Sequence, residues 1–162
     1  MRQHQKGFTL LELLIVLAIT GAIIWPLSMA ITTLLTNPQR TEDQNIVLQQ
    51  VQNAGRWLSR DVQMSTNVTA TAPRGFPLTI TVPVDDIPAH NYTIDYLFVG
   101  SKLKRKQYNS SHVLVAETLV ADYIVTTNTT FTSLTSDLYK LSIRASTGSA
   151  VVTTIYIVGQ RL

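Results

Sequence analysis

A long apolar run dominates the first forty positions of the chain. Between positions 8 and 35 the only charged residue is Glu12, and the next charge is Arg40. A helix over this run would be about 42 Å long, which is enough to cross a bilayer. Because two basic residues precede the run and none follows it closely, the pattern predicts one membrane span with a cytoplasmic N-terminus. Pro26 removes one backbone donor inside the run and predicts a bend there.

A second helical pattern follows the apolar run. Asn37-Pro38 is a candidate break or new helix cap between the two patterns. Beyond it, apolar residues recur at intervals of three and four, which places them on one face of an α-helix. They are Val47, Val51, Ala54, Leu58 and Val62. This face is too short for a coiled coil, so we predict that it covers a β-sheet.

After Met64 the pattern changes to Thr-rich segments in which apolar and polar residues alternate. Alternation of this kind predicts strands with one buried face. The candidate strands are residues 78–82, 92–99, 102–108, 112–117, 119–126, 138–146 and 150–158. Gly100-Ser101 and Thr147-Gly148-Ser149 are hairpin turn signals. The sequence therefore predicts an α+β fold, with a long N-terminal helix packed on a mainly antiparallel sheet.

Composition narrows the partners that the chain can have. A chain of 162 residues is expected to hold one folded domain, and the absence of cysteine excludes disulfides and thiolate metal sites. Of the formal net charge of +3, two positive charges, Arg2 and Lys6, stand before the apolar run. Without them the chain is close to neutral, so its bulk charge does not indicate a nucleic-acid partner.

Glu12 is the anomaly of the apolar run. A carboxylate near the start of a membrane helix costs a few kcal/mol unless it finds a partner. No basic residue lies inside the run to supply one. A partner could come from another chain, or from a new amino group made by cleavage after Gly7, which would place that group on Phe8.

The junction Lys6-Gly7-Phe8, with Glu12 four residues beyond Phe8, resembles the prepilin-peptidase site of type IV pilins and type II secretion pseudopilins. The resemblance implies cleavage between Gly7 and Phe8, followed by N-methylation of Phe8. It also implies that Glu12 aligns the subunit with the terminal amine of a neighbour during assembly. The remaining possibility is a plain signal anchor in which Glu12 stands by chance.

The same resemblance implies an organisation and a set of partners. The expected parts are a leader peptide at 1–7, a transmembrane and assembly helix at 8–36, an amphipathic helix at 37–66 and a β-rich head at 67–162. The expected partners are prepilin peptidase, other pilins or pseudopilins, an inner-membrane assembly platform and membrane lipid. The chain would then sit in the bacterial inner membrane as a single-pass protein with its head exported, and would assemble into a filament in the periplasm or at the cell surface.

The head carries a second, looser resemblance. Its sequence is similar to the head sequences of J-type minor pseudopilins and related W-type minor pilins. The segments that carry this likeness are the helix segment GRWLSRDVQMS, Tyr92-x-Ile-x-Tyr, Leu103-Lys104-Arg105, and residues 113–117 leading into 120–124. The presence of Glu12 argues against the K-type tip subunit, whose family usually lacks that acid.

The sequence shows no catalytic constellation. His4, His90 and His112 are scattered, and no metalloprotease, nucleophile-elbow or phosphate-loop motif occurs. We therefore expect no enzyme activity, no catalytic residue and no cofactor. Asp85-Asp86, between two prolines, is interpreted as a solvated turn, with a Ca²⁺ site as the alternative.

A basic cluster in the head has two interpretations. It consists of Lys102, Lys104, Arg105 and Lys106, and the three lysines would share one face of a strand. The first interpretation is an exposed edge strand that the charges protect against aggregation. The second is contact with an acidic patch on a partner subunit, and DNA contact is weakly supported because Tyr108 is the only nearby aromatic residue.

Three functions of different classes remain at this stage. The leading one is a structural minor subunit of a type II secretion pseudopilus or a type IV pilus-like filament. The second is a membrane-anchored binding module of a pilus-related DNA-uptake or adhesion system. The third, an anchored enzyme, is opposed by the missing catalytic motifs.

Overall fold

The computed structural model describes residues 9–84 and 90–160, and for residues 36–39 the backbone alone. The chain divides into two compact units, with the boundary between Thr41 and Glu42. One helix, α1 (Leu10–Gln63), contributes to both units. The predicted break at Asn37-Pro38 is wrong, because α1 continues through both residues. A proline inside a helix removes a single hydrogen bond, so it weakens the helix locally without ending it there.

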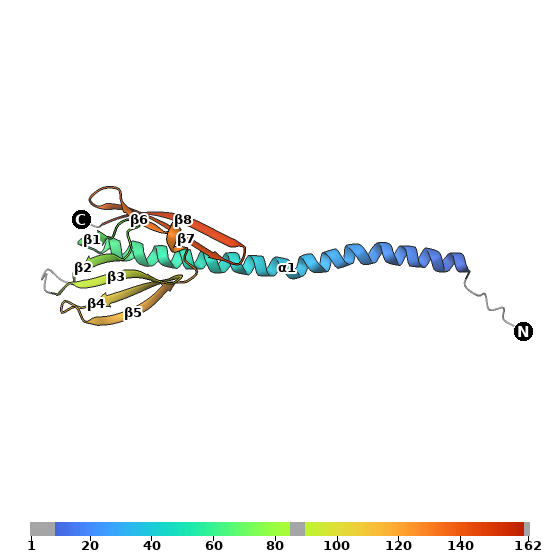
Figure 1. Cartoon of the computed structure of the whole chain (residues 1–162), viewed down its shortest axis with the longest axis horizontal. Coiled ribbons are helices and arrows are strands. Elements are labelled where there is room, and N and C mark those ends of the chain that lie inside the picture. The colour runs from blue at the N-terminus through green and yellow to red at the C-terminus, as the bar shows by residue number, and fades with distance from the viewer. Residues whose placement is uncertain (1–8, 85–89, 161–162) are drawn as a thin grey trace, which may run out of the picture. The chain divides into compact units, whose positions relative to one another are not determined.

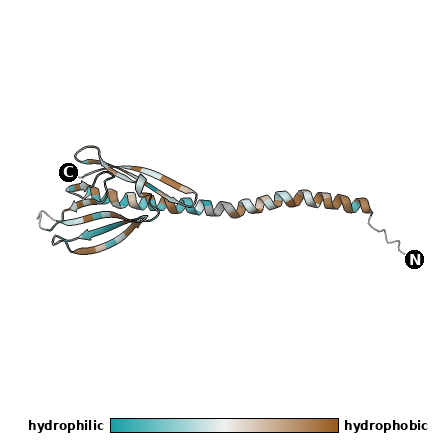
Figure 2. Cartoon of the chain, viewed as in Figure 1, coloured by the Kyte–Doolittle hydropathy of each residue, from teal (hydrophilic) through white to brown (hydrophobic). Residues whose placement is uncertain are grey.

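The first unit is a helical stem with an apolar surface. Its large apolar side chains between Leu10 and Leu35 are all exposed, and Figure 2 shows brown, apolar positions dominating this part of α1. By length and composition α1 holds a stretch that can cross a membrane. The stem hydroxyls donate back to the carbonyl four residues earlier, as in Thr20 to Val16 at 2.7 Å and Ser28 to Ile24 at 2.9 Å. Hydroxyls satisfied in this way do not need water, which suits a lipid environment.

The second unit is built around the C-terminal part of α1, which lies between two antiparallel sheets (Figure 1). The first sheet has the order β1-β2-β3-β4-β5, with bounds β1 (Asn67–Ala70), β2 (Leu78–Val82), β3 (Tyr92–Val99), β4 (Lys102–Tyr108) and β5 (Leu114–Ala121). The second has the order β6-β7-β8, with bounds β6 (Thr130–Ser133), β7 (Leu138–Thr147) and β8 (Ala150–Gly159). A short 3-10 helix, η2 (Thr126–Asn128), precedes β6. The predicted α+β class is confirmed, and the structure adds that the strands form two sheets.

The predicted apolar face of the helix is confirmed as the centre of the core. All five of its residues, Val47, Val51, Ala54, Leu58 and Val62, are fully buried. Gly55 lies so close to β8 that a Cβ atom there would overlap the ring of Tyr156. Glycine at this position therefore permits the helix to approach the second sheet closely.

Most predicted strands agree with the structure, and two do not. The segments predicted at 112–117 and 119–126 form one strand, β5, and the chain then turns so that Ile124 bridges to Ala145 of β7. The ladder with β4 runs in regular register across the predicted gap, where Thr118 pairs with Arg105. The strands β1 and β6 were missed because each has four residues and weak alternation.

Candidate functional site

Glu12 and Thr9 cap the start of the stem helix. The Glu12 carboxylate accepts hydrogen bonds from the backbone N–H and the hydroxyl of Thr9, each at 3.3 Å. In return, the backbone N–H of Glu12 donates to the Thr9 hydroxyl at 3.3 Å. This reciprocal arrangement is a capping box, and it satisfies backbone donors that a helix start otherwise leaves open. A negative charge in the first turn is also favoured by the helix dipole.

The capping box was missed at the level of the sequence, although its signal is present. Thr9 and Glu12 have the Thr-x-x-Glu spacing that defines the motif. The carboxylate therefore has local partners within its own chain. The hydrogen bonds do not neutralise its charge, so the predicted role of Glu12 in assembly stays a prediction. Gly7 and Phe8, the predicted processing residues, lie outside the described residues, as does the Asp85-Asp86 pair.

A buried ion pair joins α1 to the first sheet. Arg105 of β4 donates from Nε to Oδ2 of Asp61 at 2.7 Å, and Tyr96 of β3 donates its hydroxyl to the same oxygen at 2.6 Å. The two charged side chains are almost entirely buried. Arg105 also lies over the Trp57 ring, with 5.3 Å between the guanidinium carbon and the ring centroid. The pair therefore connects α1 to β4 inside the core.

Burial and the charge of Asp61 together determine the protonation of Tyr96 and Arg105. Burial of the phenol and the neighbouring Asp61 carboxylate raise the pKa of Tyr96 far above its ordinary value. Burial opposes the charge of Arg105, but the hydrogen bond and the negative charge of Asp61 outweigh it and raise the pKa of Arg105. Tyr96 and Arg105 thus stay protonated, and both can donate to Asp61.

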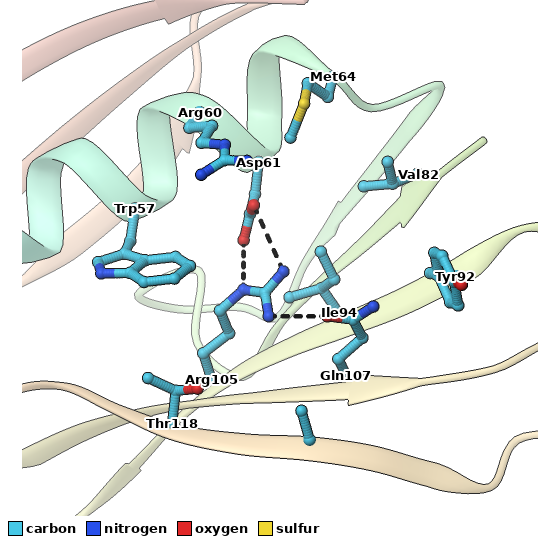
Figure 3. A pocket seen from close by; sticks show the side chains of 11 residues that line it. Trp57, Arg60, Asp61, Met64, Val82, Tyr92, Ile94, Arg105, Gln107 and Thr118 are labelled. Carbon is cyan, nitrogen blue, oxygen red and sulfur yellow. Dashed lines mark hydrogen bonds and ion pairs between the residues drawn. The ribbon is translucent and has the colours of Figure 1, made fainter. Parts of the chain in front are cut away.

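A groove opens beside this ion pair, between α1 and the inner face of the first sheet (Figure 3). Its volume is about 430 Å³. The residues that line it are Trp57, Arg60, Asp61 and Met64 of α1, Val82 of β2, Tyr92 and Ile94 of β3, Arg105 and Gln107 of β4, and Ala116 and Thr118 of β5. Asp61 and Arg105 balance one another, so the exposed Arg60 leaves the groove with a net positive charge. A groove of this size with an aromatic wall can hold a side chain or a small ligand.

The interpretation of the basic cluster as charges that protect an exposed edge strand is wrong. Its strand, β4, lies between β3 and β5, so it has no free edge. Arg105 points inward to Asp61, while two of the lysines on the other face pair with Glu117 of β5. The Lys104 pair is the shorter, at 2.6 Å, and its hydrogen bond is the main cause that lowers the pKa of Glu117. Acidic neighbours therefore already balance much of the positive charge on this surface.

The described part of the chain holds no group of three or more His, Asp or Glu side chains arranged for a metal ion. His112 instead stacks on Tyr108, with 4.8 Å between the ring centroids.

The apolar stem and the β-rich head, packed on one helix, form an α+β fold that is consistent with the pilin fold. The N-terminal segment matches the family described as the prokaryotic N-terminal methylation motif, over residues 2–28. This match supports the type IV pilin and pseudopilin family. No curated protein and no solved structure matches the chain.

Proposed function

We propose that the chain is a structural minor subunit of a type II secretion pseudopilus or a type IV pilus-like filament. The observation that carries the proposal is the methylation motif at residues 2–28, which opens a helix whose apolar side chains are exposed. Prepilin peptidase removes residues 1–7, Phe8 becomes the N-methylated terminus, and the stem holds the subunit in the inner membrane until assembly. The looser likeness of the head to J-type and W-type subunits supports a minor position. The subunit works by its surfaces and catalyses no reaction.

The leader should be cleaved between Gly7 and Phe8. We expect mass spectrometry of the protein extracted from membranes to show an N-terminal methyl-phenylalanine. A Gly7→Leu variant, which blocks the junction, serves as the control and should keep its leader. An intact leader on the parent chain, in a host with an active peptidase, would contradict the proposal.

The charge of Glu12 should matter for assembly more than its capping hydrogen bonds. Glu12→Gln keeps a side chain that can complete the capping box, whereas Glu12→Ala removes both the cap and the charge. If Glu12 pairs with the Phe8 amine of a neighbour in a low-dielectric setting, both variants should lower crosslinking to partner pilins by roughly tenfold or more. Both should still insert, be processed and keep a folded head. Parent-like crosslinking of Glu12→Gln at matched membrane levels would mean that the charge is dispensable.

The second candidate is a membrane-anchored binding module of a DNA-uptake or adhesion system. It is favoured by the groove beside Asp61 and Arg105, whose net positive charge suits an anionic ligand. Co-sedimentation of the chain with sheared filaments separates the candidates, because an anchored module would stay with the membrane.

A further inference from the structure

The edge strand β8 lacks the features that keep sheet edges from pairing. It pairs only with β7 among the described residues, over ten consecutive positions without a register shift. Its sequence, AVVTTIYIVG, contains no charged residue and no proline. Three of its β-branched side chains point away from the core and stand half exposed, at 49% for Val151, 56% for Ile155 and 57% for Ile157. Soluble proteins usually block such an edge with lysine, proline or a bulge, and β8 has none of these features.

The edge strand of the first sheet, β5, also has an open side, and register shifts interrupt its ladder with β4 near Leu103 and Tyr108. It pairs only with β4 in the described part of the chain, which leaves its other side open. Val115 and Leu119 are exposed on its outer face, and Ala116 and Thr118 line the groove on its inner face. An incoming strand therefore meets Val115 and Leu119 on the outer face of β5 and Ala116 on its inner face.

The two edges run in opposite directions along α1. On β8, Gly148 precedes the strand beside Asp43, and Gln160 follows it and donates to Ser65 at 2.9 Å, so β8 runs in the same direction as α1. At the end of β5, the N–H of Asp122 donates to Gln50 at 2.8 Å. The start of β5 instead lies beside the groove residues near the end of α1, so β5 runs against α1.

These directions decide which edges can meet. Two copies anchored in one membrane carry their head helices in the same direction, and this step rests on the proposed function. β8 of one copy is then antiparallel to β5 of its neighbour, as in every ladder of the head. Two β8 strands could pair antiparallel only if the helices ran in opposite directions. Pairing of β8 with β5 also leaves β5 of the first copy and β8 of the second open, so the contact does not close on itself.

We propose that β8 of one subunit pairs edge to edge with β5 of a neighbouring copy, forming an antiparallel contact between heads. The backbone groups of the two edges supply the hydrogen bonds. At the contact, the side chains of Val151, Ile155 and Ile157 become shielded from water. Charge does not oppose the pairing, because β8 carries no charged residue and Glu117 of β5 is already paired with Lys104 and Lys106.

The chain has no cysteine, so thiol crosslinking reports only the introduced positions. Two differently tagged full-length copies, one with Val115→Cys and one with Ile155→Cys, are produced together in cells and treated with a short bismaleimide. We expect a crosslinked product carrying both tags. Its yield should exceed several-fold that of Val115→Cys with Ser133→Cys, which places the second thiol on the exposed strand β6 at the opposite edge. Adding Thr153→Lys to the Ile155→Cys copy puts a charge on the β8 edge and should return the yield to the control level.

A yield no greater than that of the Ser133 control would overturn the proposal, as would a stronger product from two Ile155→Cys copies. A second pair, with Ile23→Cys in both stems, reports assembly through the stem. Stem crosslinks without the head product would reject the edge contact and leave the proposed function standing. The head product without stem crosslinks would support the contact and count against assembly through the stem.

Discussion

Asp61→Ala should lower the free energy of unfolding of the head by about 3–5 kcal/mol. The substitution leaves the Arg105 guanidinium buried without its counter-charge, and it removes the acceptor of the Tyr96 hydroxyl. A loss of this size should lower the melting temperature by roughly 10 °C or more. Thermal unfolding of the detergent-solubilised full chain, followed by near-ultraviolet circular dichroism, measures the change.

A matched control and a rescue make this test specific. Glu117→Ala removes an acid that pairs with Lys104 at the exposed surface, and its melting should stay close to that of the parent. Asp61→Leu combined with Arg105→Met replaces both charges by apolar groups and should recover much of the loss, because no buried charge then remains unpaired. If Asp61→Ala melts like Glu117→Ala, the pair does not hold the helix to the sheet.

Leu58→Asp should destabilise the head by several kcal/mol, because it places an unpaired carboxylate at the centre of the core. Leu58 is fully buried on the face of α1 that the two sheets cover. Asn53→Asp adds the same charge to an exposed position of the same helix and should change the melting temperature little. Similar melting of the two variants in the same assay would show that this face of α1 does not form the core.

Local chemistry and periodicity determined much of what this protein is. The apolar run with one acid, headed by Lys6-Gly7-Phe8, indicated a pilin-like stem from the sequence alone, because that junction is a short local motif. The recurrence of apolar residues at intervals of three and four, from Val47 to Val62, placed the core face of α1. Hairpin signals at Gly100 and Gly148 placed two strand pairs within a residue of their ends, since a tight turn fixes the register of its strands.

Only the tertiary structure decided which strands become neighbours and which charges become buried. Arg105 stands in the sequence among three lysines, yet the alternation of side chains along β4 turns it inward, where Asp61 lies forty-four residues away. The division into two sheets and the free edges β5 and β8 likewise depend on contacts between distant segments. Periodicity reports which face of an element is apolar, but it does not report what packs on that face. The ion pair, the groove and the open edges of β5 and β8 arise from that packing, and so they appear only when the chain is folded.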